Sequence, residues 1–426
     1  MKRILLLATT TGYQTRMFGE AAERAGAKLV FATDRCDRLE DPWWDQAVPV
    51  RFHQEEKSVR AIVKATADAP VDGVLAVGDR PTVLAARAAA TLGLPGHPVE
   101  AVRAAGNKLR ARERFAAAGL STPWFTEVSI AMDPVMAAAG VPYPCVLKPL
   151  VLSGSRGVIR ADDEAGFVHA FERIARLLSA KDVQALRDPA AGTILVERYI
   201  RGDEFALEGV LDRGTLHTLA IFDKPDPLVG PFFEETIYVT PSSHPAAVQQ
   251  AIRDAMAAAC HALGLWHGPV HAECRVNEEG VWVLEVAARP IGGLCARALR
   301  FARPGGETMP LEEVLLRHAL GEPVTTLVRE TAASAVMMVP IPKRGLYRGV
   351  GGIEAARGVP GVDDVRITAK ADQDLVPLPE GASYLGFVFA RGTSPHAAVA
   401  AVRAAHDRLE FSIDTALPVM GVVRED

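Results

Sequence analysis

Short apolar runs and longer amphipathic stretches alternate along the first hundred residues. The runs Ile4–Ala8, Leu29–Ala32 and Gly73–Val77 have the length and the apolar character of buried strands. The amphipathic helices expected around them cover Phe18–Ala25, Val59–Ala67 and Thr82–Thr91. Strands that alternate with helices predict an open, doubly wound parallel sheet. We expect this first domain to span residues 1–105.

A turn-rich segment at Gly93–Pro98 ends this regular alternation. One arginine- and alanine-rich helix is expected from about Val99 to Ala118, and a mixed pattern follows it. The predicted strands and strand-rich segments lie near Cys145–Pro149, Thr193–Tyr199, Phe205–Phe222 and Val270–Val286. Beyond them come short strands with Gly and Pro turns and one helix near His396–Leu409. This α+β pattern predicts a central domain over residues 106–325 and a C-terminal domain over residues 326–426.

The composition narrows the class of protein. Of the 426 residues, 49% are apolar and 23% are charged, which is typical of a globular chain with a large core. A net charge of −5 lacks the basic excess of many nucleic-acid binders, so no nucleic-acid partner is expected. No apolar run approaches the length of a membrane span, and we expect a cytoplasmic protein. The five cysteines are an odd number and form no CxxC pair, which argues against a disulfide framework and against a structural zinc site.

A lysine and a loop of small residues follow one predicted strand. Lys148 stands near the end of the strand, and the loop Ser153–Gly157 comes soon after it. Small residues let backbone N–H groups approach phosphate oxygens, and lysine adds a compact positive charge. The loop lacks the GxxxxGK[ST] pattern. Taken alone, it also fits an ordinary surface loop, just as the charged segment Glu197–Glu204 fits a plain hairpin.

The hairpin of residues 270–286 is the most informative segment. A three-residue loop, Glu278–Gly280, would pair Asn277 with Val281 and place Glu273 opposite Glu285. Directly paired carboxylates repel each other, and a shared divalent cation removes the conflict. Oxygen ligands suit Mg²⁺. A two-residue loop would instead send the two glutamates to opposite faces of the hairpin.

The order of these motifs along the chain resembles that of the ATP-grasp superfamily. The motifs are Asn107-Lys108, Lys148, the Ser153–Gly157 loop, Glu197–Glu204, and then Glu273 and Glu285 with Arg289. Within the superfamily the chain is similar to carboxylate–amine ligases of the L-amino acid ligase type. The resemblance covers nearly the whole chain and implies a doubly wound pre-ATP-grasp domain, a two-lobed ATP-grasp core and a C-terminal cap domain. The segment Tyr384–Gly392 resembles part of that cap.

The resemblance implies that one group of residues binds ATP. These residues are Lys108, Lys148, Ser153, Gly154, Ser155, Gly157, Glu197, Tyr199, Ile200 and Glu204. In this assignment the two lysines and the small-residue loop hold the phosphates. Glu197 and the main chain that follows it hold adenine, and Glu204 binds the ribose hydroxyls.

The resemblance also implies that a second group of residues takes part in the reaction. Glu273 and Glu285 would hold Mg²⁺, for which Mn²⁺ can substitute, and Arg289 would stabilise the acyl phosphate and the tetrahedral intermediate. The family pattern often reads Glu-x-Asn-x-Arg, whereas this chain has Ala287 at the asparagine position. Ala287 supplies no side-chain oxygen, so the number of metal ions stays open.

The implied reaction joins a small-molecule carboxylate, expected to be an amino acid, to an amine. ATP would phosphorylate the carboxylate, and the amine would then displace phosphate. Residues expected to border these substrates are Lys224, Glu235, His271, Gly292 and Gly293, although each also fits an ordinary core or surface role. Two alternatives remain: another ATP-grasp ligase or carboxylase, such as a biotin-carboxylase-like or purine-pathway enzyme, and a catalytically silent nucleotide-binding protein. The resemblance is also compatible with a homodimer.

Overall fold

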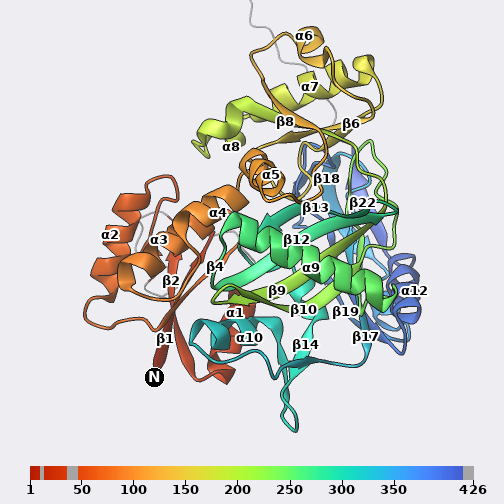
Figure 1. Ribbon diagram of the computed structural model, residues 1–426. Helices are drawn as coiled ribbons and strands as arrows, with labels where there is room; N and C mark the ends of the chain where they lie inside the picture. The colour runs from red at the N-terminus through yellow and green to blue at the C-terminus, as the bar shows by residue number, and fades with distance from the viewer. Residues whose placement is uncertain (10–13, 36–46, 416–426) are drawn as a thin grey trace, which may run out of the picture.

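The computed structural model describes residues 1–9, 14–35 and 47–415 (Figure 1). Its N-terminal part is a parallel sheet with strand order β3-β2-β1-β4. The strands are β1 (Lys2–Ala8), β2 (Ala27–Thr33), β3 (Val48–Pro49) and β4 (Gly73–Val77). The helices around it are α1 (Thr15–Arg24), α2 (Glu55–Thr66) and α3 (Thr82–Leu92).

Strand β1 shows why its apolar run is continuous. Ile4 packs in a core that contains Phe18 of α1, whereas the next residue, Leu5, packs in a separate core with Ile62 of α2. Successive side chains of a strand point to opposite faces, so a strand covered by helices on both faces needs apolar residues at every position. The predicted doubly wound sheet is therefore confirmed.

The single helix predicted from Val99 to Ala118 is wrong. The chain forms two helices, α4 (Val99–Ala105) and α5 (Lys108–Ala117). The side chain of Asn107 accepts a hydrogen bond from the Arg110 amide at 3.1 Å, which caps a new helix and interrupts the first one. This break places Lys108 at the first turn of α5.

A four-stranded antiparallel sheet forms a separate lobe at the top of Figure 1, with strand order β5-β8-β6-β7. Its strands are β5 (Phe125–Ser129), β6 (Cys145–Pro149), β7 (Ile159–Ala161) and β8 (Thr193–Arg198). The helices of this lobe are α6 (Pro134–Ala138), α7 (Glu164–Leu178) and α8 (Lys181–Gln184). Helix α7 buries Phe167, Phe171 and Ile174, one or two helical turns apart, in the core of this lobe.

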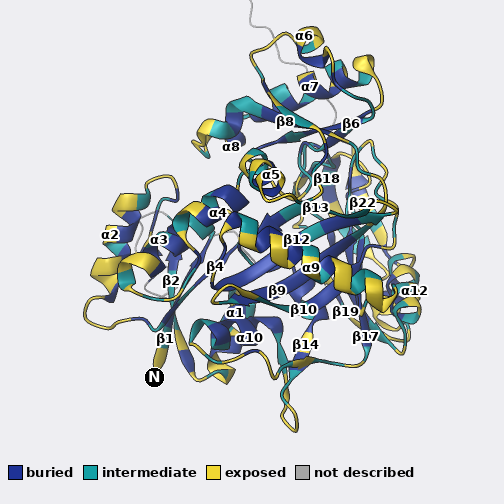
Figure 2. Ribbon diagram, in the orientation of Figure 1, coloured by how far each residue is buried: buried dark blue, intermediate teal, exposed yellow. Residues whose placement is uncertain are grey.

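An eight-stranded antiparallel sheet forms the centre of the molecule, in the order β13-β12-β9-β10-β11-β17-β21-β19. Its strands are β9 (Asp203–Asp212), β10 (Thr215–Asp223), β11 (Ile237–Thr240), β12 (Gly268–Asn277), β13 (Gly280–Ala287), β17 (Ala333–Val339), β19 (Val362–Ile367) and β21 (Gly386–Gly392). Helices α9 (Ala246–Leu263) and α12 (Pro395–His406) pack on it, and buried and exposed positions alternate along α9 (Figure 2). Because β11 pairs with β17, the C-terminal region continues the central sheet.

Two small sheets and two helices complete the described chain. They comprise β14 (Arg300–Ala302), β15 (Thr308–Pro310), β16 (Val328–Arg329), β18 (Gly345–Gly351), β20 (Asp374–Leu375), β22 (Glu410–Asp414), α10 (Leu311–Ala319) and α11 (Ile353–Arg357). Helix α10 packs against α1 and β4. Gly73 permits this approach, since a Cβ there would lie 2.4 Å from the Ala319 carbonyl oxygen. The boundaries expected after residues 105 and 325 stay predictions.

None of the helices in the described ranges is both long enough and apolar enough to cross a membrane.

Candidate active site

One cavity of about 270 Å³ gathers most of the predicted site residues. Those that line it are Lys108, Lys148, Ser153, Gly154, Ser155, Glu197, Tyr199, Ile200, Glu204, Glu235, His271, Glu273, Glu285, Arg289, Gly292 and Gly293. Gly157 and Lys224 lie outside the lining. The lining residues come from α5, from the four-stranded sheet, from the central sheet and from the C-terminal region, so folding brings together segments that are far apart in the sequence.

In the hairpin β12–β13, Glu273 pairs with Glu285 as predicted, but the turn and the register that produce this pairing differ from the prediction. Its turn has two residues, because Asn277 pairs with Gly280, so the predicted three-residue loop is wrong. Regular pairing continues to Cys274 and Val283, where a bulge at Leu284 shifts the register by one residue. One extra residue turns every later side chain to the other face. Glu273 therefore faces Glu285 after all.

Arg112 of α5 holds this bulge in place and was not predicted. Its guanidinium donates hydrogen bonds to the carbonyl oxygens of Val283 at 2.5 Å and Leu284 at 3.0 Å. It also pairs with Glu197. Arg112 is only 2% exposed and lies between buried Ala111 and Phe115. An arginine on the apolar face of a helix was the signal in the sequence.

Glu197 links Arg112 to Lys148. The Lys148 ammonium lies 2.5 Å from Oε2 of Glu197, and both carboxylate oxygens are thus engaged by cations. Burial alone would raise the pKa of Glu197, but the charges of Arg112 and Lys148 lower it to about 2. In this structure Glu197 anchors Lys148 at the cavity, and its contact with adenine stays a prediction.

Lys224 lies behind the lining, at the centre of an acidic cluster. Its ammonium is 2.8 Å from Oε1 of Glu204 and 3.1 Å from Oε1 of Glu273, and it also pairs with Glu235. Burial, together with the charge of Glu273, raises the pKa of Glu235 to about 7, whereas the three carboxylates hold the pKa of Lys224 well above its usual value. The sequence predicted that Lys224 borders the substrate; the structure gives it these three glutamate partners.

The acidic cluster has the donor set that Mg²⁺ prefers. Carboxylate oxygens of Glu204, Glu235 and Glu273 all lie within 4.8 Å of one another, and Glu285 faces Glu273 across the hairpin. Among the described residues, the side-chain contacts of Glu273 all reach its Oε1 atom, which leaves Oε2 to a cation. Because Lys224 already contacts Oε1 of Glu204, Glu235 and Glu273, the implied ion fits at Oε2 of Glu273, beside Glu285.

A second buried carboxylate, Glu208 of β9, orients His271. Glu208 is fully buried, and its Oε2 lies 3.1 Å from Nδ1 of His271, while both its oxygens accept from the Ile291 amide at 3.1 Å. Nε2 of His271 lies 3.5 Å from Glu273. Burial lowers the pKa of His271, but the two carboxylates outweigh it and raise the value to about 9. Glu208 was not predicted, although a glutamate within an apolar strand was visible in the sequence.

Arg289 is paired with Asp79, which was also missed. Nε of Arg289 donates to Oδ1 of Asp79 at 2.7 Å. Asp79 follows β4, at the carboxyl edge of the parallel sheet, where ligands of such sheets bind. A polar residue at that edge was the available signal. The pair joins the N-terminal sheet to the strand that carries Glu285.

The small-residue loop is tied to the C-terminal region. Ser155 has φ 57°, a left-handed conformation, and its carbonyl oxygen accepts a hydrogen bond from the Val158 amide at 3.1 Å. The Gly157 amide donates to the Pro379 carbonyl at 2.8 Å, and Arg156 donates to the Glu380 carbonyl at 2.7 Å. The Gly157 amide is thus already engaged, and its predicted contact with ATP stays a prediction.

Main-chain contacts fix two predicted positions at the rim of the cavity. The Lys108 ammonium donates to the Leu152 carbonyl at 2.7 Å, which brings α5 against the start of the small-residue loop. Nε2 of the Gln14 side chain donates to the carbonyls of Ile291 at 3.1 Å and Gly293 at 2.6 Å. Gln14 therefore positions the Gly292–Gly293 segment, a role that the sequence did not suggest.

An apolar wall completes the cavity on the C-terminal side. Met338, Tyr384 and Phe387 line it there, and the rings of Tyr384 and Phe387 are 6.2 Å apart. Phe233 and Cys295 extend the apolar lining. The lining of the cavity therefore combines charged and apolar side chains, which suits a small amphipathic molecule.

Three family models match consecutive parts of the chain. Residues 19–96 match an ATP-grasp N-terminal domain, residues 141–298 an ATP-grasp domain, and residues 337–414 the L-amino acid ligase C-terminal domain 2. The matches follow the same order as the three structural regions.

Solved and curated proteins agree with these models. The crystal structure of L-amino acid ligase from Bacillus licheniformis superposes with a TM-score of 0.81 at 25% identity, over 97% of this chain and 99% of that one. Alanine–anticapsin ligase of Bacillus subtilis (strain 168) is 28% identical over 56% of this chain and 52% of its own length. Carnosine synthase 1 of Gallus gallus is 32% identical over 59% of this chain and 27% of its own length. The chain thus spans about half or less of these two curated relatives.

The fold, the cavity and the order of the matched domains lead to one assignment. A parallel N-terminal sheet, an antiparallel lobe that carries Lys148 and a central sheet that carries Glu273 surround one site. The C-terminal region closes this site with residues of a domain that is named for one group of ligases. The chain belongs to the ATP-grasp superfamily and carries the C-terminal domain of the L-amino acid ligases.

Proposed function

We propose that this protein is an ATP-dependent carboxylate–amine ligase that forms an amide or peptide bond through an acyl phosphate and releases ADP and phosphate. The observation that carries the proposal is that Lys148, the acidic cluster around Glu273 and Arg289 all open into one cavity. This set combines the groups needed to hold terminal phosphates and to stabilise charge during phosphoryl transfer.

Different residues of the cavity have different roles in the proposed reaction. Lys148, anchored by Glu197, and the backbone N–H groups of the loop around Gly154 hold the phosphates. Mg²⁺ held at Glu273 and Glu285 would neutralise phosphate charge during transfer. Arg289, fixed by Asp79, stabilises the oxyanion that forms when the amine attacks the acyl group.

The residues that line the cavity also favour one class of substrate, the amino acids. The lining includes charged groups that suit a carboxylate and an amine, and it also includes Met338, Tyr384 and Phe387, which suit an apolar side chain. The names of the L-amino acid ligase and of the alanine–anticapsin ligase indicate amino acid substrates for those proteins. We extend this class to the present chain. The proposal includes small-molecule partners, a cytoplasmic location and compatibility with a homodimer.

The experiment that tests the proposal is a screen for ADP release across pairs of acids and amines, with the nucleotide product identified by chromatography. ADP and phosphate, formed only when both an acid and an amine are present, is the expected result. AMP and pyrophosphate would refute the acyl-phosphate route. Bicarbonate-dependent ADP release would favour a carboxylase, and ATP binding without turnover of any pair would favour a silent nucleotide-binding protein.

A further inference from the structure

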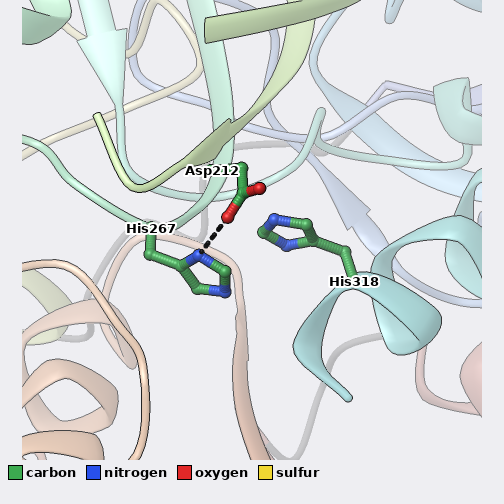
Figure 3. Close-up of side chains that lie close together, drawn as sticks. All are labelled: Asp212, His267 and His318. Atoms are coloured by element: carbon green, nitrogen blue, oxygen red, sulfur yellow. Dashed lines mark ion pairs between the residues drawn. The ribbon is translucent and has the colours of Figure 1, made fainter. Parts of the chain in front are cut away.

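Three side chains that the active site does not use meet at the far end of the central sheet (Figure 3). Asp212 is the last residue of β9, His267 directly precedes β12, and His318 belongs to α10. Glu204, which lines the cavity, stands at the other end of β9. At about 3.3 Å per residue, roughly 26 Å of strand separates Asp212 from Glu204. The cluster is therefore remote from the active site.

The geometry of the three side chains is that of a ligand set. Each offers one nitrogen or oxygen atom, and these atoms all lie within 4.8 Å of one another. Nδ1 of His267 is 3.3 Å from Oδ1 of Asp212, and the imidazoles of His267 and His318 stack with centroids 4.3 Å apart. Figure 3 shows the His318 ring turned toward the Asp212 carboxylate.

His318 provides a second, independent observation. It is only 3% exposed, and its Nε2 atom has no hydrogen-bond partner among the residues that the structure describes. A buried polar atom without a partner destabilises a fold unless something else binds it. Burial lowers the pKa of His318 to about 4 and also lowers the pKa of His267. Neutral imidazole is the form of histidine that binds metals.

We propose that Asp212, His267 and His318 bind one divalent transition metal ion, with Zn²⁺ the best fit. Two imidazole nitrogens and one carboxylate oxygen form a common zinc ligand set, with bonds of about 2.0–2.2 Å. Mg²⁺ prefers oxygen ligands and suits the glutamate cluster of the active site instead. The Asp212 side chain is 44% exposed, so water completes the coordination.

Binding requires a small local rearrangement. Tetrahedral bonds of about 2.1 Å place ligand atoms about 3.4 Å apart, so the side chains must close by about 1 Å or slightly more. The ion lies in the plane of each imidazole that binds it, and the two stacked rings must tilt apart. Nearby His97 is not a ligand, since its Nδ1 accepts from the Trp266 amide at 3.1 Å and its Nε2 faces the Pro269 carbonyl at 3.3 Å.

The site joins three parts of the fold. Asp212 ends one strand of the central sheet, His267 directly precedes another, and His318 lies on the helix that packs against β4 of the N-terminal sheet. A bound ion would tie this helix to the central sheet. The three ligands come from well-separated segments and form no sequence motif, which is why the pattern of residues did not reveal them.

The test is zinc binding by the full chain, measured by calorimetry without ATP and with excess Mg²⁺ to occupy the glutamate cluster. We expect one Zn²⁺ per chain, and an affinity reduced on the order of 100-fold in Asp212→Asn and His318→Gln. His261→Gln, at an exposed histidine of α9, is the matched control and should bind like the wild type. Zinc at 100 times its Kd should also raise the ratio of folded to unfolded wild-type protein about 100-fold.

Two results would overturn the proposal: no stoichiometric zinc binding by the wild type, or equal binding by both ligand variants. Because Asp212 is partly exposed, Asp212→Asn should keep the fold, and circular dichroism separates lost binding from lost folding. The measurement needs neither ATP nor substrates, so its failure would leave the ligase proposal untouched.

Discussion

Replacing Glu312 with glutamine should stabilise the protein at alkaline pH and change little in acid. Glu312 lies in the first turn of α10 and is 1% exposed, and neither of its carboxylate oxygens has a hydrogen-bond partner among the described residues. Its neighbour Glu313 is also buried but pairs with Arg24 at 3.0 Å and with Arg317 at 2.9 Å. The two adjacent glutamates form a matched pair, one without and one with partners.

The magnitude follows from the pKa of Glu312. Burial raises it from 4.5 to about 7. Between these values the unfolded chain loses its proton first, so the free energy of unfolding falls as pH rises through this window and levels off above it. The difference corresponds to about 3 kcal/mol. Glutamine has the same shape as glutamate but carries no charge. Glu312→Gln therefore removes the fall in the free energy of unfolding that accompanies ionisation of Glu312.

The assay is urea unfolding of the wild type, Glu312→Gln and Glu313→Gln at several pH values from about 4.5 to 8.5. The difference between Glu312→Gln and wild type should grow from near zero to as much as about 3 kcal/mol across this range. Glu313→Gln should instead lose about 1.5–3 kcal/mol at neutral pH, since it breaks hydrogen bonds between charged groups. A Glu312→Gln variant that is no more stable than wild type at pH 8, or equally stabilised at all pH values, would refute the reasoning.

The remaining predictions concern the cavity. Glu273→Gln and Glu285→Gln should each abolish Mg²⁺-dependent turnover without loss of the fold, and full activity in both would remove the metal assignment. Lys148→Ala should weaken ATP binding in calorimetry far more than it lowers thermal stability without nucleotide; unchanged affinity would contradict its role. Arg289→Ala should lower kcat on the order of 100-fold with little change in ATP affinity, whereas a loss confined to ATP binding would move it out of the chemistry. Glu197→Gln should reduce the free energy of unfolding by about 3 kcal/mol in denaturant titrations, because its buried arginine partner loses its counter-charge; an unchanged value would show that the pair is not needed for stability.

The sequence by itself determined the elements whose pattern is local. The apolar run of β1 was sufficient to predict a strand covered on both faces, and the pattern of Thr82–Thr91 predicted α3, which the structure shows as Thr82–Leu92. The order of five motifs along the chain, from Asn107-Lys108 to Arg289, was sufficient to recognise the resemblance to the superfamily. These features depend on spacing between neighbours, which the sequence displays directly.

Only the tertiary structure decided how these residues meet. The predicted turn of the β12–β13 hairpin was wrong, yet Glu273 faces Glu285, because a bulge at Leu284 restores the register and Arg112 holds its carbonyl oxygen. The partner of Arg289 comes from the distant N-terminal sheet. Such contacts join residues separated by tens to hundreds of positions, and no periodicity along the chain encodes them. They exist because burial in a close-packed interior stabilises a charged group only when a segment that the fold brings beside it supplies a partner.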